Sequence, residues 1–270
     1  MRKNKKMVAI VVPRYKKTLS SDDQLSLKHL NKYLNRYDKF YAIPNALKAK
    51  RIQAPGFKSI QFPDYFFKNR EAYNELLLTE DFYQKFTDYE YILIYQLDAL
   101  VFSDQLKNWC QKGYDYIGAP LIHPRIGQVS YKYRDYLCGN GGFSLRKVKS
   151  FIQILKLADK TAKRVTRNSV IQKIWFAQAI FTGQVRKIWL KAPAYCYPFA
   201  EDGFWSFEAQ KYDPKFNIAP IEESFRFAFE RYPRLCFKVS NNQIPFGAHA
   251  WKKHDQKFWL LIINSIKNPD

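Results

Sequence analysis

Short apolar runs alternate with amphipathic stretches through the first half of the chain. Residues 8–12 form a continuous run of β-branched and small apolar residues closed by a proline, a pattern typical of a strand that is buried on both faces. Residues 40–43 and 57–62 predict two more strands, and residues 91–95 (YILIY) predict the most apolar strand of the chain. A further strand is expected over residues 114–119.

Amphipathic stretches between these runs predict helices. Ser21 and Gln24 have the spacing of a capping box, so we expect a helix to begin at Ser21. Hydrophobic periodicity predicts a long helix over residues 70–86 and further helices over residues 147–162 and about residues 170–181. Strands that alternate with helices in this way favour an α/β fold, with a Rossmann-like and mostly parallel sheet flanked by helices.

The carboxyl ends of the strands are where an open sheet of this kind binds its ligands. Chemistry is therefore expected just after residues 12, 95 and 117. Residues 121–137 have no clean periodicity and predict a loop, and no internal repeat or low-complexity tract interrupts the chain. We therefore expect a single domain over residues 1–270.

The composition fits a folded chain with a strongly basic surface. Hydrophobic residues make up 47% of the 270 residues and aromatic residues 17%, which is enough to fill a substantial core. The 45 lysines and arginines against 24 aspartates and glutamates give a net charge of +21. Such a surface attracts polyanions, so nucleic acid, an anionic lipid leaflet and phosphorylated small molecules are candidate partners, and a merely solvated basic surface is the alternative.

The cysteines and the N-terminal residues favour a cytoplasmic protein. Cys110, Cys138, Cys196 and Cys236 form no CxxC pair, which argues against a zinc site and against a disulfide framework. The basic N-terminal residues are followed by an apolar run that is too short for a signal peptide or a membrane span. We expect a protein that is soluble or bound peripherally to a membrane.

Carboxylates in apolar surroundings are the first candidates for chemistry. Asp98 follows the most apolar strand, where an unpaired carboxylate is costly, so a metal, an arginine or turn amides could compensate it. A turn-capping aspartate is the simpler interpretation.

Glu201 and Asp202 precede Gly203 and two aromatic residues, a setting that could raise the pKa of a carboxyl group toward that of a general base. A helix N-cap is the alternative for this pair.

A histidine and a glycine run are the other candidates. His249 lies in the segment PFGAHAW, where small neighbours would let its imidazole reach a crowded site, and a core histidine is the simpler alternative. The run from Gly139 to Gly142 (GNGG) permits close approach of a ligand to the backbone, whose amides could meet phosphate or hydroxyl groups. Its spacing matches neither a dinucleotide fingerprint nor a phosphate-binding loop.

Taken in order, five segments of the chain resemble the DUF5672 family, whose members are similar to bacterial glycosyltransferases of the GT-A type. The segments are Tyr91–Phe102 (YILIYQLDALVF), Asp115–Pro120 (DYIGAP), Gly139–Arg146 (GNGGFSLR), Glu201–Asp202 and Pro245–Trp251 (PFGAHAW). The resemblance covers nearly the whole chain. It implies a GT-A-like fold in which about residues 7–120 bind the donor and about residues 121–270 form the acceptor side.

The resemblance also implies a cation site. Asp98 matches the last carboxylate of the DxD motif, which binds a divalent cation on the donor's diphosphate, and His249 matches the histidine that completes the metal shell. Oxygen and imidazole ligands suit Mn²⁺ or Mg²⁺. Gln96 stands at the first position of the DxD motif and cannot bind a metal as a carboxylate would, so metal independence is the alternative.

The resemblance further implies a base and a sugar pocket. Glu201 and Asp202 match the acidic pair that supplies the general base in inverting enzymes, and Asp202 is favoured as the base. The residues expected to bind the donor nucleotide and line the sugar pocket are Gln96, Gly139, Asn140, Gly141 and Gly142.

The function implied is that of a hexosyltransferase-type glycosyltransferase. It would move a sugar from a nucleotide-diphosphate sugar to a glycan or lipid-linked acceptor, with inversion, in the synthesis of bacterial lipopolysaccharide or capsule. The basic surface would hold such an enzyme at the inner face of the membrane, and no nucleic-acid partner is expected. The alternatives are a basic nucleic-acid-binding module and a catalytically inactive sugar-binding protein of the same fold.

Overall fold

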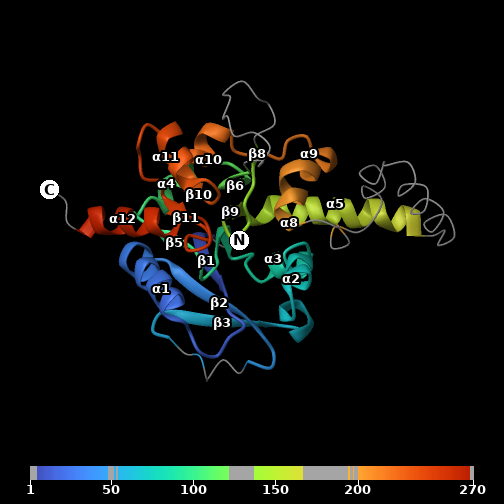
Figure 1. Ribbon diagram of the computed structural model, residues 1–270. Coiled ribbons are helices and arrows are strands. Elements are labelled where there is room, and N and C mark those ends of the chain that lie inside the picture. The colour runs from blue at the N-terminus through green and yellow to red at the C-terminus, as the bar shows by residue number, and fades with distance from the viewer. Residues whose placement is uncertain are drawn as a thin grey trace, which may run out of the picture.

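A six-stranded sheet lies at the centre of the computed structural model, which describes residues 5–47, 52, 54–121, 137–166, 194, 197 and 200–267 (Figure 1). The strand order is β3-β2-β1-β4-β9-β6. The bounds are β1 (Lys6–Pro13), β2 (Asp38–Pro44), β3 (Phe57–Phe62), β4 (Tyr89–Tyr95), β6 (Tyr116–Gly118) and β9 (Phe143–Lys147). Strand β9 runs antiparallel to its neighbours β4 and β6, whereas β3, β2, β1 and β4 are parallel to one another.

Helices cover both faces of this sheet, so the predicted α/β fold with a mostly parallel, helix-flanked sheet is confirmed. They are α1 (Ser21–Leu34) and α4 (Leu106–Gln111) on one face, and α2 (Arg70–Leu76), α3 (Glu80–Gln84) and α5 (Val148–Thr166) on the other. Alternate residues of β1 join opposite cores: Val8, Ile10 and Val12 face α1, and Ala9 and Val11 face α3 and α5. Over residues 8–12 neither face of this strand meets water, and this part of the sequence therefore has no polar side.

Helix α1 begins at Ser21, as predicted, but its capping box lies one residue earlier than predicted. The N-cap is Ser20, whose Oγ accepts a hydrogen bond from the Asp23 amide at 3.2 Å, and the Asp23 carboxylate accepts one from the Ser20 amide at 2.9 Å. The predicted pair of Ser21 and Gln24 is therefore wrong. Ser20 has the extended backbone of a cap (φ −70°, ψ 169°), while Ser21 is already helical.

The long helix predicted over residues 70–86 is also wrong, because the chain breaks it into α2 and α3. Leu76, Leu77 and Leu78 are all 1–2% exposed and all belong to one core. Successive side chains of a continuous helix are rotated by about 100°, so the first and the third of three consecutive residues point to nearly opposite sides. Three consecutive leucines of one helix could therefore not all face one core. The break turns them inward together, and Thr79 Oγ1 donates to the Leu76 carbonyl at 2.7 Å where α2 ends.

A second, three-stranded sheet has the order β10-β11-β5. Its strands are β5 (Leu100–Val101), β10 (Ala228–Phe229) and β11 (Gly247–Ala248). The other elements are η2 (Asp64–Phe67), α8 (Glu201–Gly203), η4 (Phe204–Glu208), α9 (Ala209–Tyr212), α10 (Ile221–Phe227), α11 (Pro233–Val239), α12 (Gln256–Lys267) and the strand pair β7 (Pro120–Leu121) with β8 (Leu137–Cys138). In Figure 1, α10 and α11 lie above the parallel strands β1 to β3.

Some sequence-based expectations lie outside the described residues. The helix predicted over residues 170–181 and all but the ends of the loop predicted over residues 121–137 are among them, as is Cys196. The cysteines that the structure describes, Cys110, Cys138 and Cys236, are buried free thiols. Among the described helices, none combines the length and the apolar character that crossing a bilayer requires.

Replacing Ser20 with alanine should lower the free energy of unfolding by about 1 kcal/mol, because the Asp23 amide loses its acceptor. Ser21→Ala serves as the matched control, since Ser21 is exposed and lies inside the helix, and it should change stability by less than about 0.5 kcal/mol. Urea denaturation of both variants measures the difference. Equal losses in the two variants would contradict the assignment of the cap.

Candidate active site

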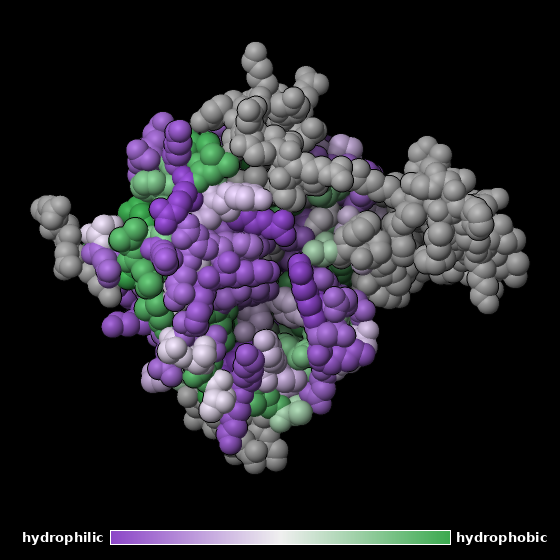
Figure 2. Space-filling model, in the orientation of Figure 1, coloured by the Kyte–Doolittle hydropathy of each residue, from purple (hydrophilic) through white to green (hydrophobic). Residues whose placement is uncertain are grey.

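A cleft with a volume of about 670 Å³ opens at the carboxyl ends of β1 and β4. Its walls include the residues that follow β1 (Arg14–Lys16), those that follow β4 (Gln96–Asp98) and those that precede β9 (Asn140–Gly142). Figure 2 shows a hollow near the middle of this face of the molecule, bordered by hydrophilic residues. The cleft lies at the strand ends, where the sequence predicted ligand binding.

The candidate residues from the sequence converge on this cleft, with one exception. The lining includes Gln96, Asp98, Asn140, Gly141, Gly142, Glu201, Asp202 and His249. Gly139 is not among the lining residues; its carbonyl accepts a hydrogen bond from the Tyr116 hydroxyl at 2.7 Å, and a Cβ there would overlap the Ser206 hydroxyl. Gly139 is therefore a packing glycine behind the cleft, which corrects its predicted place in the donor site.

His249, which follows β11, faces Asp98 and Gln96 across the cleft wall. Its Nε2 lies 3.3 Å from Asp98 Oδ1 and 3.1 Å from Gln96 Oε1. The ring can approach β9 this closely because Gly142 has no side chain, and a Cβ there would overlap the imidazole. The His249 side chain is 11% exposed and that of Asp98 is 53% exposed, so the histidine is part of the wall and the carboxylate reaches into the opening.

Glu230, which follows β10, lines the same cleft and was not predicted from the sequence. Its Oε1 lies 3.5 Å from His249 Nδ1, and its Oε2 accepts a hydrogen bond from Asn140 Nδ2 at 2.9 Å. No motif marks this residue. The signal that could have found it is the one that singled out Asp98, an acid directly after an apolar, aromatic run, here residues 227–229 (FAF).

Burial and hydrogen bonding act in opposite directions on this cluster. Burial lowers the pKa of the His249 imidazole, but hydrogen bonds with Asp98 and Glu230 outweigh it and raise the pKa to about 9. Burial favours a higher pKa for the carboxyl groups of Asp98 and Glu230, yet His249 holds the pKa of each below its ordinary value. At neutral pH these groups are therefore an imidazolium between two carboxylates.

The donor atoms around Nε2 fit part of the shell of a divalent cation. Two ligands at right angles on a cation with bonds of about 2.1 Å lie about 3 Å apart. The separations of His249 Nε2 from Asp98 Oδ1 and Gln96 Oε1, 3.3 and 3.1 Å, are close to that value. Within the described residues, no group of three or more His, Cys, Asp or Glu side chains is arranged to hold a metal ion. Asp98 and His249 could supply two protein ligands, and the Gln96 amide oxygen, 3.1 Å from Nε2, is the candidate for a third.

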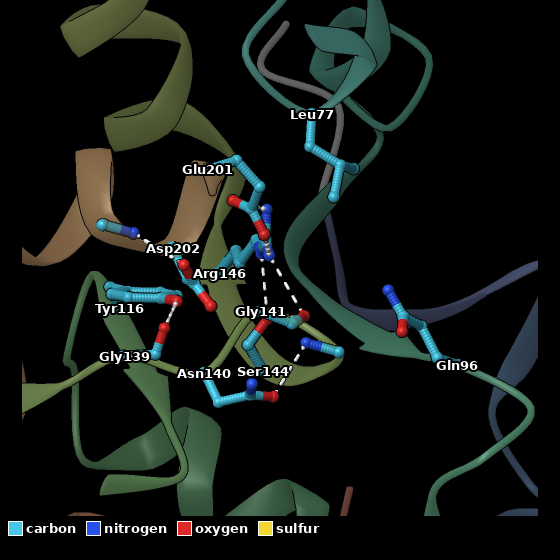
Figure 3. Close-up of polar contacts among 12 residues, drawn as sticks. Leu77, Gln96, Tyr116, Gly139, Asn140, Gly141, Ser144, Arg146, Glu201 and Asp202 are labelled. Carbon is cyan, nitrogen blue, oxygen red and sulfur yellow. Dashed lines mark hydrogen bonds and ion pairs between the residues drawn. The ribbon is translucent and has the colours of Figure 1, made fainter. Parts of the chain in front are cut away.

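Arg146 and Glu201 form a buried ion pair beside the cleft (Figure 3). The Arg146 side chain is 0% exposed, and its Nη2 and Nη1 donate to the two carboxylate oxygens of Glu201 at 2.8 and 3.1 Å. The guanidinium also donates to Tyr83 Oη, Ser144 Oγ and the Gly141 carbonyl at 2.9, 3.0 and 3.1 Å. With both its oxygens bound in this way, Glu201 has a structural part and does not fit the catalytic role predicted for it.

Asp202 is the more exposed acid of the pair, and it also lines the cleft. Its Oδ1 accepts a hydrogen bond from the Gly203 amide at 2.8 Å, which fixes the carboxylate on the turn of α8 (Figure 3). Burial nonetheless raises the pKa of the Asp202 carboxyl above its ordinary value. A carboxylate with a raised pKa accepts a proton more readily than an exposed one, as a general base must.

Exposed basic side chains surround the opening. They are Lys16, Lys68, Arg70, Arg231 and Lys253. No salt bridge ties any of them to a carboxylate among the described residues, so their charge is available to an anionic ligand. Arg14 differs, because it is buried and donates to the carbonyls of Lys16 and Lys17, and it thereby shapes the loop after β1.

Replacing Arg146 with methionine should lower the free energy of unfolding by about 3–5 kcal/mol, because it leaves the Glu201 carboxylate buried without a cation. Adding Glu201→Met should restore part of that loss, since the double variant buries no unpaired charge. Lys252→Met, which breaks the exposed pair with Asp22, serves as the control and should cost less than about 1 kcal/mol. Denaturant titration of the unmodified protein, these three variants and Glu201→Met alone measures these values. A loss in the double variant equal to the sum of the losses in Arg146→Met and Glu201→Met would contradict the coupling.

Comparison with known proteins identifies the family. No curated protein matches the chain. Among solved structures it is similar to the galactosyltransferase LgtC in complex with donor and acceptor sugar analogs, with 12% identity over 89% of this chain and 86% of that one and a TM-score of 0.48. It is also similar to the apo form of the glycosyltransferase GlyE of Streptococcus pneumoniae TIGR4, with 11% identity and a TM-score of 0.44. That match covers 90% of this chain and about half (54%) of the GlyE chain. A family model described as a protein of unknown function (DUF5672) matches residues 56–249, and the chain therefore belongs to the DUF5672 family.

Proposed function

We propose that this protein is a glycosyltransferase that moves a sugar from a nucleotide-diphosphate donor to a hydroxyl group of a glycan or lipid-linked acceptor. The observation that carries the proposal is the convergence of Asp98, His249 and Asp202, which are far apart in the sequence, on one cleft at the strand ends. Exposed lysines and arginines around that cleft suit a diphosphate. Its volume of about 670 Å³ is that of an ordinary small-molecule site.

In this proposal the donor's diphosphate lies between the cation site and the basic rim. Asp98 and His249, with the Gln96 amide oxygen, would hold a Mn²⁺ or Mg²⁺ ion. That ion supplies the charge that neutralises the departing diphosphate. The lysines and arginines of the rim bind the same phosphates and orient the donor, and Asn140 and the glycines that follow it bring the backbone close to the sugar.

Asp202 is the proposed general base. It takes the proton of the acceptor hydroxyl while that oxygen bonds to the anomeric carbon of the donor sugar. The bond from the same carbon to the diphosphate breaks, and its electron pair leaves with the phosphate oxygen. A single displacement of this kind inverts the anomeric carbon. Glu201, held by Arg146, keeps the turn that carries Asp202 in place.

Nucleotide release, measured over a panel of nucleotide sugars with Mn²⁺ or Mg²⁺, tests this function. Asp202→Asn should lower kcat about 10²–10⁴-fold, because the base is lost, and should leave nucleotide affinity nearly unchanged. Asp81→Asn, at the exposed start of α3, is the matched control and should retain full activity. Donor binding without turnover in the unmodified protein would indicate an inactive sugar-binding protein, and binding of an oligonucleotide in place of any nucleotide sugar would indicate a nucleic-acid-binding module.

The stability of Asp202→Asn separates loss of the base from loss of the fold. A raised carboxyl pKa means that the folded protein binds this proton more tightly than the unfolded chain. The stability that this group contributes therefore falls as the pH rises from the unfolded pKa through the folded pKa. The asparagine side chain does not ionise, so the variant does not lose this stability as the pH rises. At neutral pH it should therefore melt at or above the Tm of the unmodified protein.

We propose, as the finer part of this function, that the acceptor is a lipid-linked intermediate of bacterial lipopolysaccharide or capsule synthesis and that α12 contacts the anionic leaflet that presents it. On α12, Leu260 is 41% and Leu261 63% exposed. The helix (QKFWLLIINSIK) carries lysines and no acidic residue. Apolar residues are visible in Figure 2 at the edge where Figure 1 places α12. Exposed leucines beside lysines suit an anionic lipid surface, as does the net charge of +21.

Co-sedimentation with phosphatidylcholine vesicles, with and without phosphatidylglycerol, tests this contact. The protein should bind the anionic vesicles, and Leu260→Ser with Leu261→Ser should weaken binding at least about tenfold, because burial of two leucine side chains supplies more than about 1.4 kcal/mol. Phe207→Ser, on the similarly exposed Phe207 of η4, is the control and should bind normally. Binding that is indifferent to phosphatidylglycerol, or self-association of the protein through α12 without lipid, would overturn the proposal.

A further inference from the structure

The small sheet brings three chemically active residues to one edge. Strands β10 and β11 are parallel, with Phe229 opposite Ala248, so the residues that follow them, Glu230 and His249, emerge side by side. The His249 amide donates to the Phe229 carbonyl at 2.9 Å, which extends the pairing to the histidine itself. Strand β5 pairs with β11 in the antiparallel direction, so the residues before β5, which include Asp98, meet the same edge.

At that edge the two nitrogens of the His249 ring face different partners. Nε2 faces Asp98 and Gln96 at 3.3 and 3.1 Å, in the open cleft. Nδ1 is buried, and the acceptor that faces it is Glu230 Oε1 at 3.5 Å. One edge of the ring therefore faces the open cleft, where a ligand can bind, and the other edge faces the Glu230 carboxylate.

Glu230 is itself held from the opposite side. Its Oε2 accepts a hydrogen bond from Asn140 Nδ2 at 2.9 Å, and Asn140 Oδ1 accepts one from the Gly142 amide at 3.0 Å. The Glu230 side chain is 14% exposed, so water has little access to compete for its oxygens. The chain of contacts runs from the glycine segment of the cleft, through Asn140 and Glu230, to His249.

We propose that Glu230 is the positioning residue of the cation site. By accepting the Nδ1–H bond of His249, it keeps the proton on Nδ1 when a cation displaces the proton of Nε2, so the nitrogen left free to bind the cation is the one on the side of Asp98 and Gln96. The same contact fixes the plane of the ring. A carboxylate behind a metal-binding histidine acts in this way because it raises the basicity of the imidazole and removes its rotational freedom. This inference rests on the proposed function, since it assigns a support to the cation site of that function.

The test is Mn²⁺ binding by the full chain without donor or acceptor, with the free ion measured by electron paramagnetic resonance. Glu230→Ala should raise the Kd for Mn²⁺ about 10–100-fold. Glu230→Gln should bind Mn²⁺ more tightly than Glu230→Ala, because its amide oxygen still accepts the Nδ1–H bond. Glu222→Gln, on the exposed first turn of α10, is the matched control and should bind as the unmodified protein does. Thermal melts of each variant confirm that it is folded.

The outcomes separate the two proposals. If the unmodified protein binds Mn²⁺ and Glu230→Ala binds it equally well, the positioning role is overturned and the proposed function stands. If Glu230→Gln is no better than Glu230→Ala, the charge of Glu230 matters and its hydrogen bond does not, which also overturns the positioning role. If the unmodified protein binds no Mn²⁺, both this inference and the cation site of the proposed function fail.

Discussion

Arg146 and Glu201 meet in the interior although 55 positions separate them in the sequence, and their contact lies beside the cleft and holds its walls. Arg146 belongs to the antiparallel strand β9, and Glu201 begins the turn that carries Asp202. The same guanidinium also donates to the Gly141 carbonyl, so one buried cation ties together two walls of the cleft. A buried arginine is tolerated only when its donors are satisfied, and five hydrogen bonds meet that condition here. If the turn that carries Glu201 moved away from β9, Arg146 and Glu201 would each lose the partner that balances its charge.

The carboxylates of the cleft are placed in different electrostatic surroundings. Asp98 and Glu230 lie against His249, which holds the pKa of each carboxyl low, whereas burial raises the pKa of Asp202. Neighbouring acids whose environments move their pKa values apart are suited to different tasks. The first two suit the binding or support of a positive charge, and the third suits the acceptance of a proton. The basic residues stay at the rim, where they attract an anion without neutralising the acids inside.

Each of the two sheets contributes residues to the site. The six-stranded sheet supplies Asp98 and Gln96 from the end of β4, whose last five residues are buried. The three-stranded sheet supplies His249 and Glu230 from the ends of paired short strands. Asp98 lies in the turn that connects β4 of the large sheet to β5 of the small one, and the Trp251 amide donates to its carbonyl at 3.2 Å. The proposed cation site therefore lies at the junction of the two sheets.

The sequence by itself determined the features that depend on neighbours along the chain. The strands at residues 8–12, 40–43 and 91–95 followed from continuous apolar runs, the strand at residues 57–62 followed from a mixed segment, and Asp98 followed from its place at the end of the most apolar run. The cap at Ser20 is also local, since Ser20 and Asp23 are three residues apart, although the neighbouring pair of Ser21 and Gln24 has the same spacing. The break after Leu76 and the partners of His249 were decided by the tertiary structure. In each case the physical reason is a contact between groups whose meeting no local pattern records: leucines turned into one core, and a carboxylate and an imidazole brought together by the pairing of β10 with β11. Local sequence sets which backbone shapes are favourable, and long-range packing sets which side chains meet.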